Sequence, residues 1–200
     1  MRKAAPPLEI YQIKVTLLGT KPPIWRRVLV PKTITLEQLH DVLQLAMGWY
    51  DCHLHEFRAG HDRFGAPDPD DEPMGMPAAK DERKVPVSRV LARAGAKMSY
   101  TYDFGDTWEH AILLEKRLPA DASVHYPVCI GGKRACPPED CGGIYGFYNL
   151  LEILGDPEHE EHEEMLEWAG EFDPEAFSVD EVNQKFGPRR GWSRSKRRSV

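Results

Sequence analysis

Apolar and polar side chains alternate at the start of the chain, which predicts a β-hairpin. Residues 9–18 alternate and are rich in β-branched side chains, as expected for a half-buried strand. Residues 19–23 contain one glycine and two prolines and predict a turn. Residues 24–30 predict a second strand, which Pro31 ends. We therefore expect two neighbouring strands joined at this turn.

The pattern then changes to the period of an α-helix. Thr35 is a capping residue, and Gln38, three positions later, completes the sequence signature of a capping box. Apolar side chains recur at helical spacing as far as Gly48, a residue type that commonly ends helices. The apolar stripe predicted to face a sheet consists of Leu36, Leu39, Val42, Leu43, Ala46 and Met47.

The middle of the chain predicts more strands, separated by segments rich in proline, glycine and aspartate. We expect strands at 53–60, 98–103 and 110–118, a hairpin partner from 63–65, a loop over 66–84, a short helix or turn over 86–94 and an irregular segment over 119–143.

The last third of the chain is predicted to be helical. One short helix is expected over 145–154, and Asp156 followed by Pro157 predicts the start of a helix that runs to about Ala169. Ser178 with Glu181 predicts a capping box for a last helix ending near residue 187. Together these elements predict an α+β fold, with a β-grasp-like mixed sheet, one crossing helix and a C-terminal helical cap.

Composition fits one domain with a substantial core, because 41% of the 200 residues are hydrophobic. We expect a flexible N-terminus over 1–8, a single domain over 9–186 and a basic disordered tail over 187–200. No run reaches the roughly 18 apolar residues that a membrane helix needs, so we expect no membrane association. The N-terminus has no apolar segment of a secretory signal, and a cytoplasmic location is therefore predicted.

Charge is distributed unevenly along the chain. The net charge is −6, but residues 185–200 hold seven basic residues and no acidic one, so the remainder carries 19 basic and 32 acidic residues, a net charge of −13. An acidic body does not attract nucleic acid. The basic tail, Arg189–Arg198, could bind nucleic acid. Alternatively, it acts as a solubilising end that folds back on the acidic body.

Two sets of residues suggest a metal ion. His53 and His55 would share one face of the predicted strand, and two imidazoles at this spacing can hold one ion. The alternative is a polar strand face that bonds to its neighbours. Cys129 and Cys141 lack the C-x2-C spacing of zinc ribbons, although they could form a zinc site with a histidine. A divalent metal ion is the one cofactor that these residues suggest.

Two further motifs carry the candidate binding residues. The segment YDFGDTWEH brings two carboxylates around a glycine, next to an aromatic ring and an imidazole that is predicted to titrate near neutral pH; PPEDCGG holds two acids between prolines and glycines. We expect the two motifs to meet in space and border a concave site. The alternatives are aspartates that only cap a turn, and a loop that only plugs the sheet edge. The candidates are Asp103, Asp106, Trp108, His110, Glu139 and Asp140.

Seven sequence blocks of this chain occur in an order that is typical of one protein family. PPIWRRVLVP, TLEQLHDVLQLAMGW, HLHEF, YTYDFGDTWEHAILLE, YPVCIGG, CPPEDCGG and GFYNLL follow one another over residues 8–186. The series resembles the plasmid pRiA4b ORF-3-like family, also described as insertion-element passenger proteins of TnpR type. The resemblance implies an α+β fold and an association with mobile elements. A serine resolvase needs a nucleophilic serine near its N-terminus, whereas the first serine here is Ser88, so the sequence argues against that activity.

Three functions follow from these observations. The first is a binding or adaptor module associated with mobile elements, which recognises a peptide or nucleic acid. The second is a metal-dependent enzyme of hydrolase type that uses the acids of the two motifs. The third is a protein with a structural zinc site. P-loop, dinucleotide-binding and α/β-hydrolase signatures are absent, which disfavours those classes.

Overall fold

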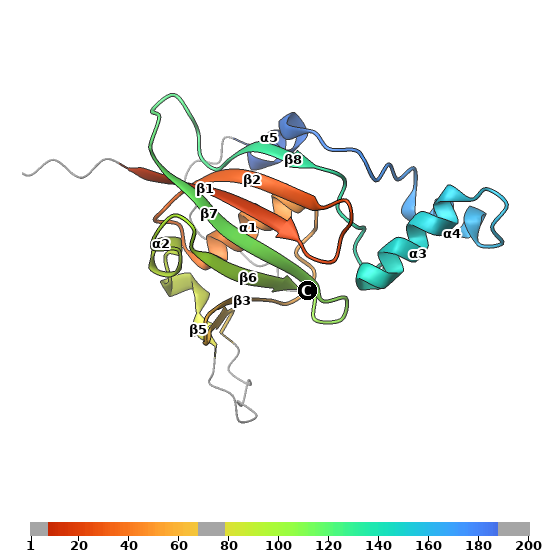
Figure 1. The fold of residues 1–200 in the computed structure, drawn as a ribbon, viewed down its shortest axis with the longest axis horizontal. Helices are drawn as coiled ribbons and strands as arrows, with labels where there is room; N and C mark the ends of the chain where they lie inside the picture. Colours follow the sequence, from red (N-terminus) through yellow and green to blue (C-terminus); the bar gives the residue numbers. More distant parts are fainter. Residues whose placement is uncertain (1–7, 68–78, 188–200) are drawn as a thin grey trace, which may run out of the picture.

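The computed structural model describes residues 8–67 and 79–187 and has an α+β architecture. Eight strands form one mixed sheet in the order β5-β4-β3-β6-β7-β1-β2-β8 (Figure 1). Every pair is antiparallel except β4 and β5. The strands are β1 (Glu9–Leu17), β2 (Ile24–Pro31), β3 (His55–Ala59), β4 (Asp62–Gly65), β5 (Lys80–Asp81), β6 (Lys97–Tyr102), β7 (Trp108–Pro119) and β8 (Val128–Lys133).

Helix α1 (Leu36–Met47) crosses one face of the sheet, as its sequence predicts (Figure 1). Thr35 and Gln38 form both bonds of the capping box, and Gly48 ends the helix in the left-handed conformation. The predicted apolar stripe is confirmed, since none of its side chains is more than 5% exposed. The buried stripe packs on the alternating apolar residues of β1 and β2, which explains why this face forms the core.

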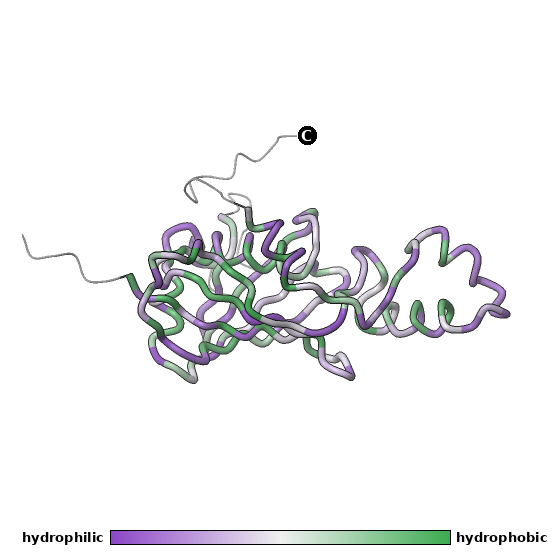
Figure 2. Tube along the Cα trace, turned by 90° about the horizontal axis from the view of Figure 1, so that it is seen from above, coloured by the Kyte–Doolittle hydropathy of each residue, from purple (hydrophilic) through white to green (hydrophobic). Residues whose placement is uncertain are grey.

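Of the remaining helices, η1 and α2 are short, and α3, α4 and α5 belong to the C-terminal third of the chain. Helix α3 and helix α4 extend away from the sheet, whereas α5 lies against β8 and α1 (Figure 1). Hydropathy along the chain shows that α4 is mostly polar (Figure 2), and none of its residues is buried. The bounds are η1 (Glu82–Lys84), α2 (Val87–Val90), α3 (Gly143–Gly155), α4 (His162–Ala169) and α5 (Val179–Phe186).

Four sequence predictions differ from the structure. The segment predicted to be a loop over 66–84 contains β5 and η1 in its described part. The segment predicted to be irregular over 119–143 contains β8, which pairs with β2. The helix predicted from Asp156 begins only at His162, because residues 157–161 form turns. The strand predicted from His53 starts at His55. The α+β class itself is confirmed, and the β-grasp-like description stays a prediction.

Some predictions fall outside the described residues. The predicted flexible N-terminus is described only at Leu8, and the predicted basic tail only at Gly187. No helix in the described part of the chain is both long and apolar enough to cross a membrane.

Candidate metal centre

Three loops come together at one end of the sheet. His55, the first residue of β3, pairs with Tyr102, the last residue of β6. The loop after α1 and the β6–β7 turn therefore leave the sheet at the same end. The third loop, between β8 and α3, carries Glu139 and Asp140 and is tied to both of the others by the hydrogen bonds described next.

The β6–β7 turn is shaped by its two aspartates. Asp103 adopts a left-handed backbone with φ of 56° and accepts a hydrogen bond from the Gly105 amide through Oδ1 at 2.9 Å. Asp106 Oδ2 accepts from the Gly142 amide at 3.1 Å and so ties the turn to the third loop. The approach is close, because a Cβ on Gly143 would stand 2.5 Å from the carbonyl oxygen of Asp106. Glycine is therefore required at that position.

The third loop is also fixed to the segment after α1. Trp49 Nε1 donates to the carbonyl of Pro137 at 3.0 Å. Glu139 Oε1 accepts from the Tyr50 amide at 2.8 Å and from the Tyr102 hydroxyl at 3.1 Å. Burial raises the pKa of Tyr102, so this hydroxyl remains a donor at neutral pH. These bonds hold the carboxylate of Glu139 over the end of β6.

These loops assemble a group that we call the His53 cluster: Cys52, His53, Asp103, Glu139 and Asp140. Ligand atoms of His53, Asp103 and Asp140 all lie within 4.8 Å of one another, and so do those of Cys52, His53 and Glu139. His53 Nε2 is 2.9 Å from Asp140 Oδ1 and 3.6 Å from Asp103 Oδ2. Ligands of a tetrahedral zinc ion stand roughly 3.3–3.8 Å apart, so small side-chain movements would complete such a site.

Two polar atoms in the His53 cluster are buried and unsatisfied. His53 Nε2 and Glu139 Oε2 have no well-directed hydrogen bond to any residue that the structure describes. An unsatisfied buried acceptor is costly unless water or an ion meets it. The Asp103 side chain is only 9% exposed, whereas that of Asp140 is 68% exposed, so the cluster is open on one side. This arrangement suits a cation that keeps one position free for water.

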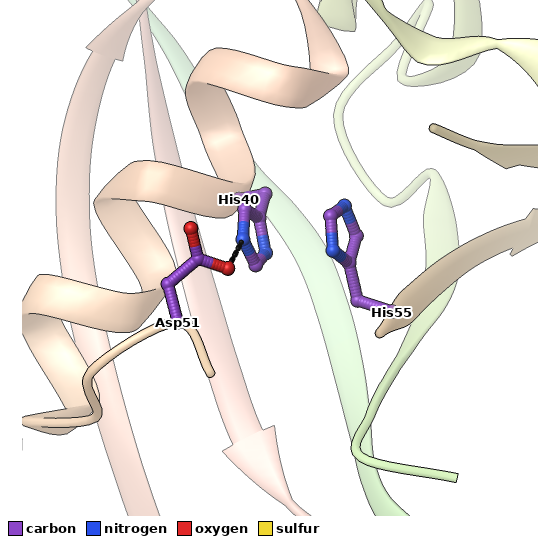
Figure 3. Close-up of side chains that lie close together, drawn as sticks. All are labelled: His40, Asp51 and His55. Carbon is purple, nitrogen blue, oxygen red and sulfur yellow. Dashed lines mark hydrogen bonds and ion pairs between the residues drawn. The ribbon is translucent and has the colours of Figure 1, made fainter. Parts of the chain in front are cut away.

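His40, Asp51 and His55 form a second group of possible ligands. Figure 3 shows how their three side chains lie. The two imidazole rings are parallel, with centroids 3.5 Å apart and 6° between their planes. Their in-plane lone pairs therefore do not converge on one ion. Both nitrogens of His40 are already engaged, Nδ1 with the Tyr100 hydroxyl and Nε2 with Asp51 Oδ1, each at 2.7 Å. Burial lowers the pKa of His40. We interpret this group as structural support.

The acids Asp103 and Asp140 of the two motifs lie close together, whereas Trp108 and His110 lie away from them. Both side chains are fully buried and pack under Trp49, with ring centroids 6.0 and 5.4 Å from it. They occupy the core face of β7 and do not line the site. Burial lowers the pKa of His110 to about 4. The prediction from the sequence that this imidazole titrates near neutral pH is therefore wrong.

The metal residues predicted from the sequence are separated in the structure. His53 belongs to the cluster, but His55 turns to Glu82, with Nε2 2.8 Å from Oε2, because β3 begins only at His55. The Cys129 thiol is buried and donates to the Gly131 carbonyl at 3.6 Å, and burial raises the pKa of Cys141 to about 12. Within the described ranges, neither cysteine is in a three-ligand group.

Sequence reasoning missed Cys52 and Tyr102. Cys52 is exposed, and its amide donates to the Tyr102 hydroxyl at 3.1 Å. Cys52 and His53 follow shortly after Gly48, which ends α1. Because cysteine and histidine are both metal-ligand types, this pair could have indicated Cys52 as a candidate ligand. The role of Tyr102 depends on a contact with Glu139, 37 positions away, which no local pattern reveals.

The fold and the site define an α+β protein with a cluster of histidine, cysteine and carboxylate side chains at one end of a mostly antiparallel sheet. Its sequence matches the family model described as plasmid pRiA4b ORF-3-like protein over residues 9–181, and the chain belongs to that family. It is 41% identical over 197 residues to "Uncharacterized protein y4hQ" of Sinorhizobium fredii, covering 96% of this chain and 98% of that relative.

A solved structure is also similar. The crystal structure of the protein of unknown function MM3350 from Methanosarcina mazei Go1 matches with a TM-score of 0.79 and 40% identity. The match covers 88% of this chain and 98% of that one. Neither relative's name states an activity, so the site must be interpreted from its chemistry.

Proposed function

We propose that this protein is a divalent-metal-dependent enzyme of hydrolase type, with its centre at the His53 cluster. The observation that supports this most is the convergence of ligand atoms of His53, Asp103 and Asp140 within 4.8 Å of one another, with His53 Nε2 buried and without a well-directed hydrogen bond to the described residues. Imidazole, thiol and carboxylate donors together favour Zn²⁺ over Mg²⁺ or Ca²⁺, which prefer oxygen ligands alone.

The chemistry follows from the open side of the cluster. A zinc ion held by His53 and Asp103 would lower the pKa of a bound water to near 7 and so supply a nucleophile at neutral pH. Asp140, the most exposed acid of the cluster, would be the third ligand. Glu139, whose Oε2 has no hydrogen bond to the residues that the structure describes, would accept the proton of that water. Hydrolysis then needs only water and a substrate with a polarised carbonyl or phosphoryl group.

The test is a metal titration of chelator-treated protein by isothermal calorimetry. We expect one equivalent of Zn²⁺ to bind, and His53→Gln or Asp103→Asn to weaken binding at least tenfold, since each removes a ligand. Asp103→Asn keeps the Oδ1 acceptor for Gly105, so the turn is expected to remain folded. His61→Gln is the matched control, because His61 is exposed beyond β3 and lies outside the cluster.

Two results would contradict this proposal. One is the lack of stoichiometric metal binding in folded wild-type protein. The other is binding that survives His53→Gln but is lost in Cys129→Ser, which would favour a structural zinc site instead. Circular dichroism on each variant separates loss of a ligand from loss of the fold.

A second candidate function is a binding or adaptor module, associated with mobile elements as the sequence resemblance implies. Four large apolar side chains are exposed around the His53 cluster, and we call them the apolar rim: Tyr50, Leu54, Phe104 and Tyr145, exposed by 84%, 68%, 55% and 85%. Two of them hold the loops through their own backbone: the Tyr50 amide donates to Glu139, and the Leu54 carbonyl accepts from the Asp103 amide. Phe104 follows Asp103, and Tyr145 lies in the first turn of α3, two residues after Gly143. Exposed apolar side chains of this size are typical of binding surfaces.

Organisation and location are part of the same proposal. One domain over 9–186 is supported by the single sheet that joins β1 to β8. A cytoplasmic location is supported by the four cysteines, which are all free thiols.

A further inference from the structure

Helices α3 and α4 form an arm that extends away from the sheet (Figures 1 and 2). Its outer part, residues 151–175, comprises the end of α3, the whole of α4 and the segment that follows α4, and we call it the acidic arm. Helix α3 begins at Gly143, beside Asp106, and Leu154 lies about 16 Å farther along this helix. The acidic arm is therefore a surface separate from the His53 cluster.

A hollow of about 340 Å³ opens on the acidic arm, and its volume is within the range of ligand pockets. Three of the residues that line it are apolar: Leu154 of α3, Leu166 of α4 and Phe172 after α4. Leu166 is 42% exposed, and none of the eight residues of α4 is buried. A helix this short has little stability on its own, so a partner that covers this apolar surface would stabilise it.

The charge on the acidic arm has one sign. Residues 151–175 contain eleven aspartate and glutamate residues and no lysine or arginine, and all eleven acids are exposed. Two of them, Glu171 and Asp173, line the hollow itself. Glu175 forms an ion pair with Arg134, and the structure shows no ion pair of the other ten with any residue in 8–67 or 79–187. These carboxylates would attract a cationic partner and repel nucleic acid.

We propose that the acidic arm is a docking surface for a basic segment of a partner protein. The segment would place one apolar side chain in the hollow and lysine or arginine side chains against Glu171 and Asp173. Charge complementarity selects this occupant, because the arm would repel an acidic partner and the arm of a second copy. A simple cation would leave the apolar lining exposed to water. This inference goes beyond the proposed hydrolase and requires no metal ion.

The test is selection from a library of random twelve-residue peptides displayed on phage, with the full chain as the immobilised protein. We expect the selected peptides to be enriched in lysine and arginine beside an aliphatic or aromatic residue. The most enriched peptide is then synthesised, and its Kd is measured by isothermal calorimetry. Its binding should weaken as NaCl rises, because the charged contacts are exposed, and should persist in chelator.

The contribution of charge is measured with two acids of the hollow. Glu171→Gln with Asp173→Asn should weaken binding of this peptide at least tenfold. Asp173→Asn keeps the Oδ1 acceptor for the Glu175 amide, so the turn is expected to remain folded. Glu109→Gln with Asp180→Asn is the matched control, because both of these acids are exposed and lie outside residues 151–175. The control should change the Kd less than twofold.

The contribution of the hollow is measured with Leu166→Ala, which removes most of one lining side chain and should weaken peptide binding at least threefold. Leu18→Ala is the matched control, since Leu18 is also 42% exposed but lies in the β1–β2 turn. It should leave the Kd unchanged. Circular dichroism on each variant separates loss of the docking surface from loss of the fold.

Three results would overturn the proposal. One is that folded wild-type protein does not enrich peptides that are both basic and apolar. Another is an equal loss of affinity in the two acid pairs, which would show that the peptide responds only to the net charge of the chain. The third is self-association of wild type that Leu166→Ala abolishes, which would identify a second copy as the occupant. Metal titration is independent of these results, so the metal centre and the docking surface can each fail alone.

Discussion

At the scale of single residues, His110 controls how stability depends on pH. It is fully buried, and burial lowers its pKa to about 4, whereas an unfolded chain binds a proton there up to about pH 6.5. Between those values the unfolded state holds more protons, so stability falls as pH drops through this window. We expect His110→Phe to remove about 2–3 kcal/mol of the difference in unfolding free energy between pH 7.5 and pH 4.5, measured by urea denaturation.

The control for this prediction is His61→Gln, which alters an exposed histidine in the β3–β4 turn and should leave the pH dependence unchanged. An identical slope in wild type and His110→Phe would show that the imidazole is not the group responsible.

Single residues also show what the sequence could and could not predict about the site. The sequence singles out the acids of the turn and the loop as candidates, because the prolines and glycines around them indicate rigid, close-packed backbone. Trp108 and His110 were misplaced, although they continue the face of Ile112 and Leu114, which are buried. The alternation of a strand places these four side chains on one face. Because Ile112 and Leu114 are apolar, that face was predictable as the core face.

At the scale of elements, the junction between the β6–β7 turn and α3 depends on Gly143. Its φ is +68°, and a Cβ there would stand 2.5 Å from the Asp106 carbonyl oxygen. Gly60 has a similar φ of +60° but nothing within 4 Å, so Gly60→Ala measures backbone strain alone. We expect Gly60→Ala to cost about 1 kcal/mol, and Gly143→Ala to cost roughly 1–3 kcal/mol more because backbone must move.

Chemical denaturation of the two variants, compared with wild type, checks this prediction. Equal costs would mean that the loop between β8 and α3 yields easily, and that the acids of the His53 cluster are not held rigidly by it.

Elements with strong local signals were predicted well, and those that depend on distant contacts were not. The β1–β2 hairpin and α1 carry their own alternation and caps. Strand β8 contains Gly131 and Gly132, which weaken the strand pattern. Gly132 makes room for Phe177, since a Cβ would stand 2.4 Å from that ring. The reason for the glycine therefore lies 45 positions away, where no local pattern records it.

At the scale of the whole molecule, the sheet has one apolar face under α1 and one polar face joined by charged pairs. Glu115 on β7 accepts from Gln12 on β1 at 2.7 Å and from Arg27 on β2 at 2.7 and 2.9 Å. Three neighbouring strands are thus linked by one carboxylate. Glu9, the first residue of β1, is held similarly by Arg117 and Lys32.

This polar face predicts the acid end of the stability profile. The Arg27 guanidinium lowers the pKa of Glu115 to about 2, from an ordinary value near 4.5. Between these values the unfolded chain binds the extra proton, so the contribution is complete above pH 4.5 and is lost as pH falls toward 2. We expect Glu115→Gln to lower stability by about 1 kcal/mol at pH 7 and to flatten the decline in this window, measured by thermal unfolding from pH 7 to pH 2.

Glu109→Gln is the matched control for that measurement, because Glu109 is exposed on the same strand, β7, and no side-chain contact to it is seen among the described residues. It should leave the profile unchanged. Since His110 acts between pH 6.5 and 4 and Glu115 between 4.5 and 2, wild type should lose stability in two successive stages. His110→Phe should weaken the first stage only, because burial also lowers the pKa of His40, and Glu115→Gln should weaken the second only. A single stage that neither variant alters would mean that acid unfolding is governed by overall charge repulsion instead of by these two groups.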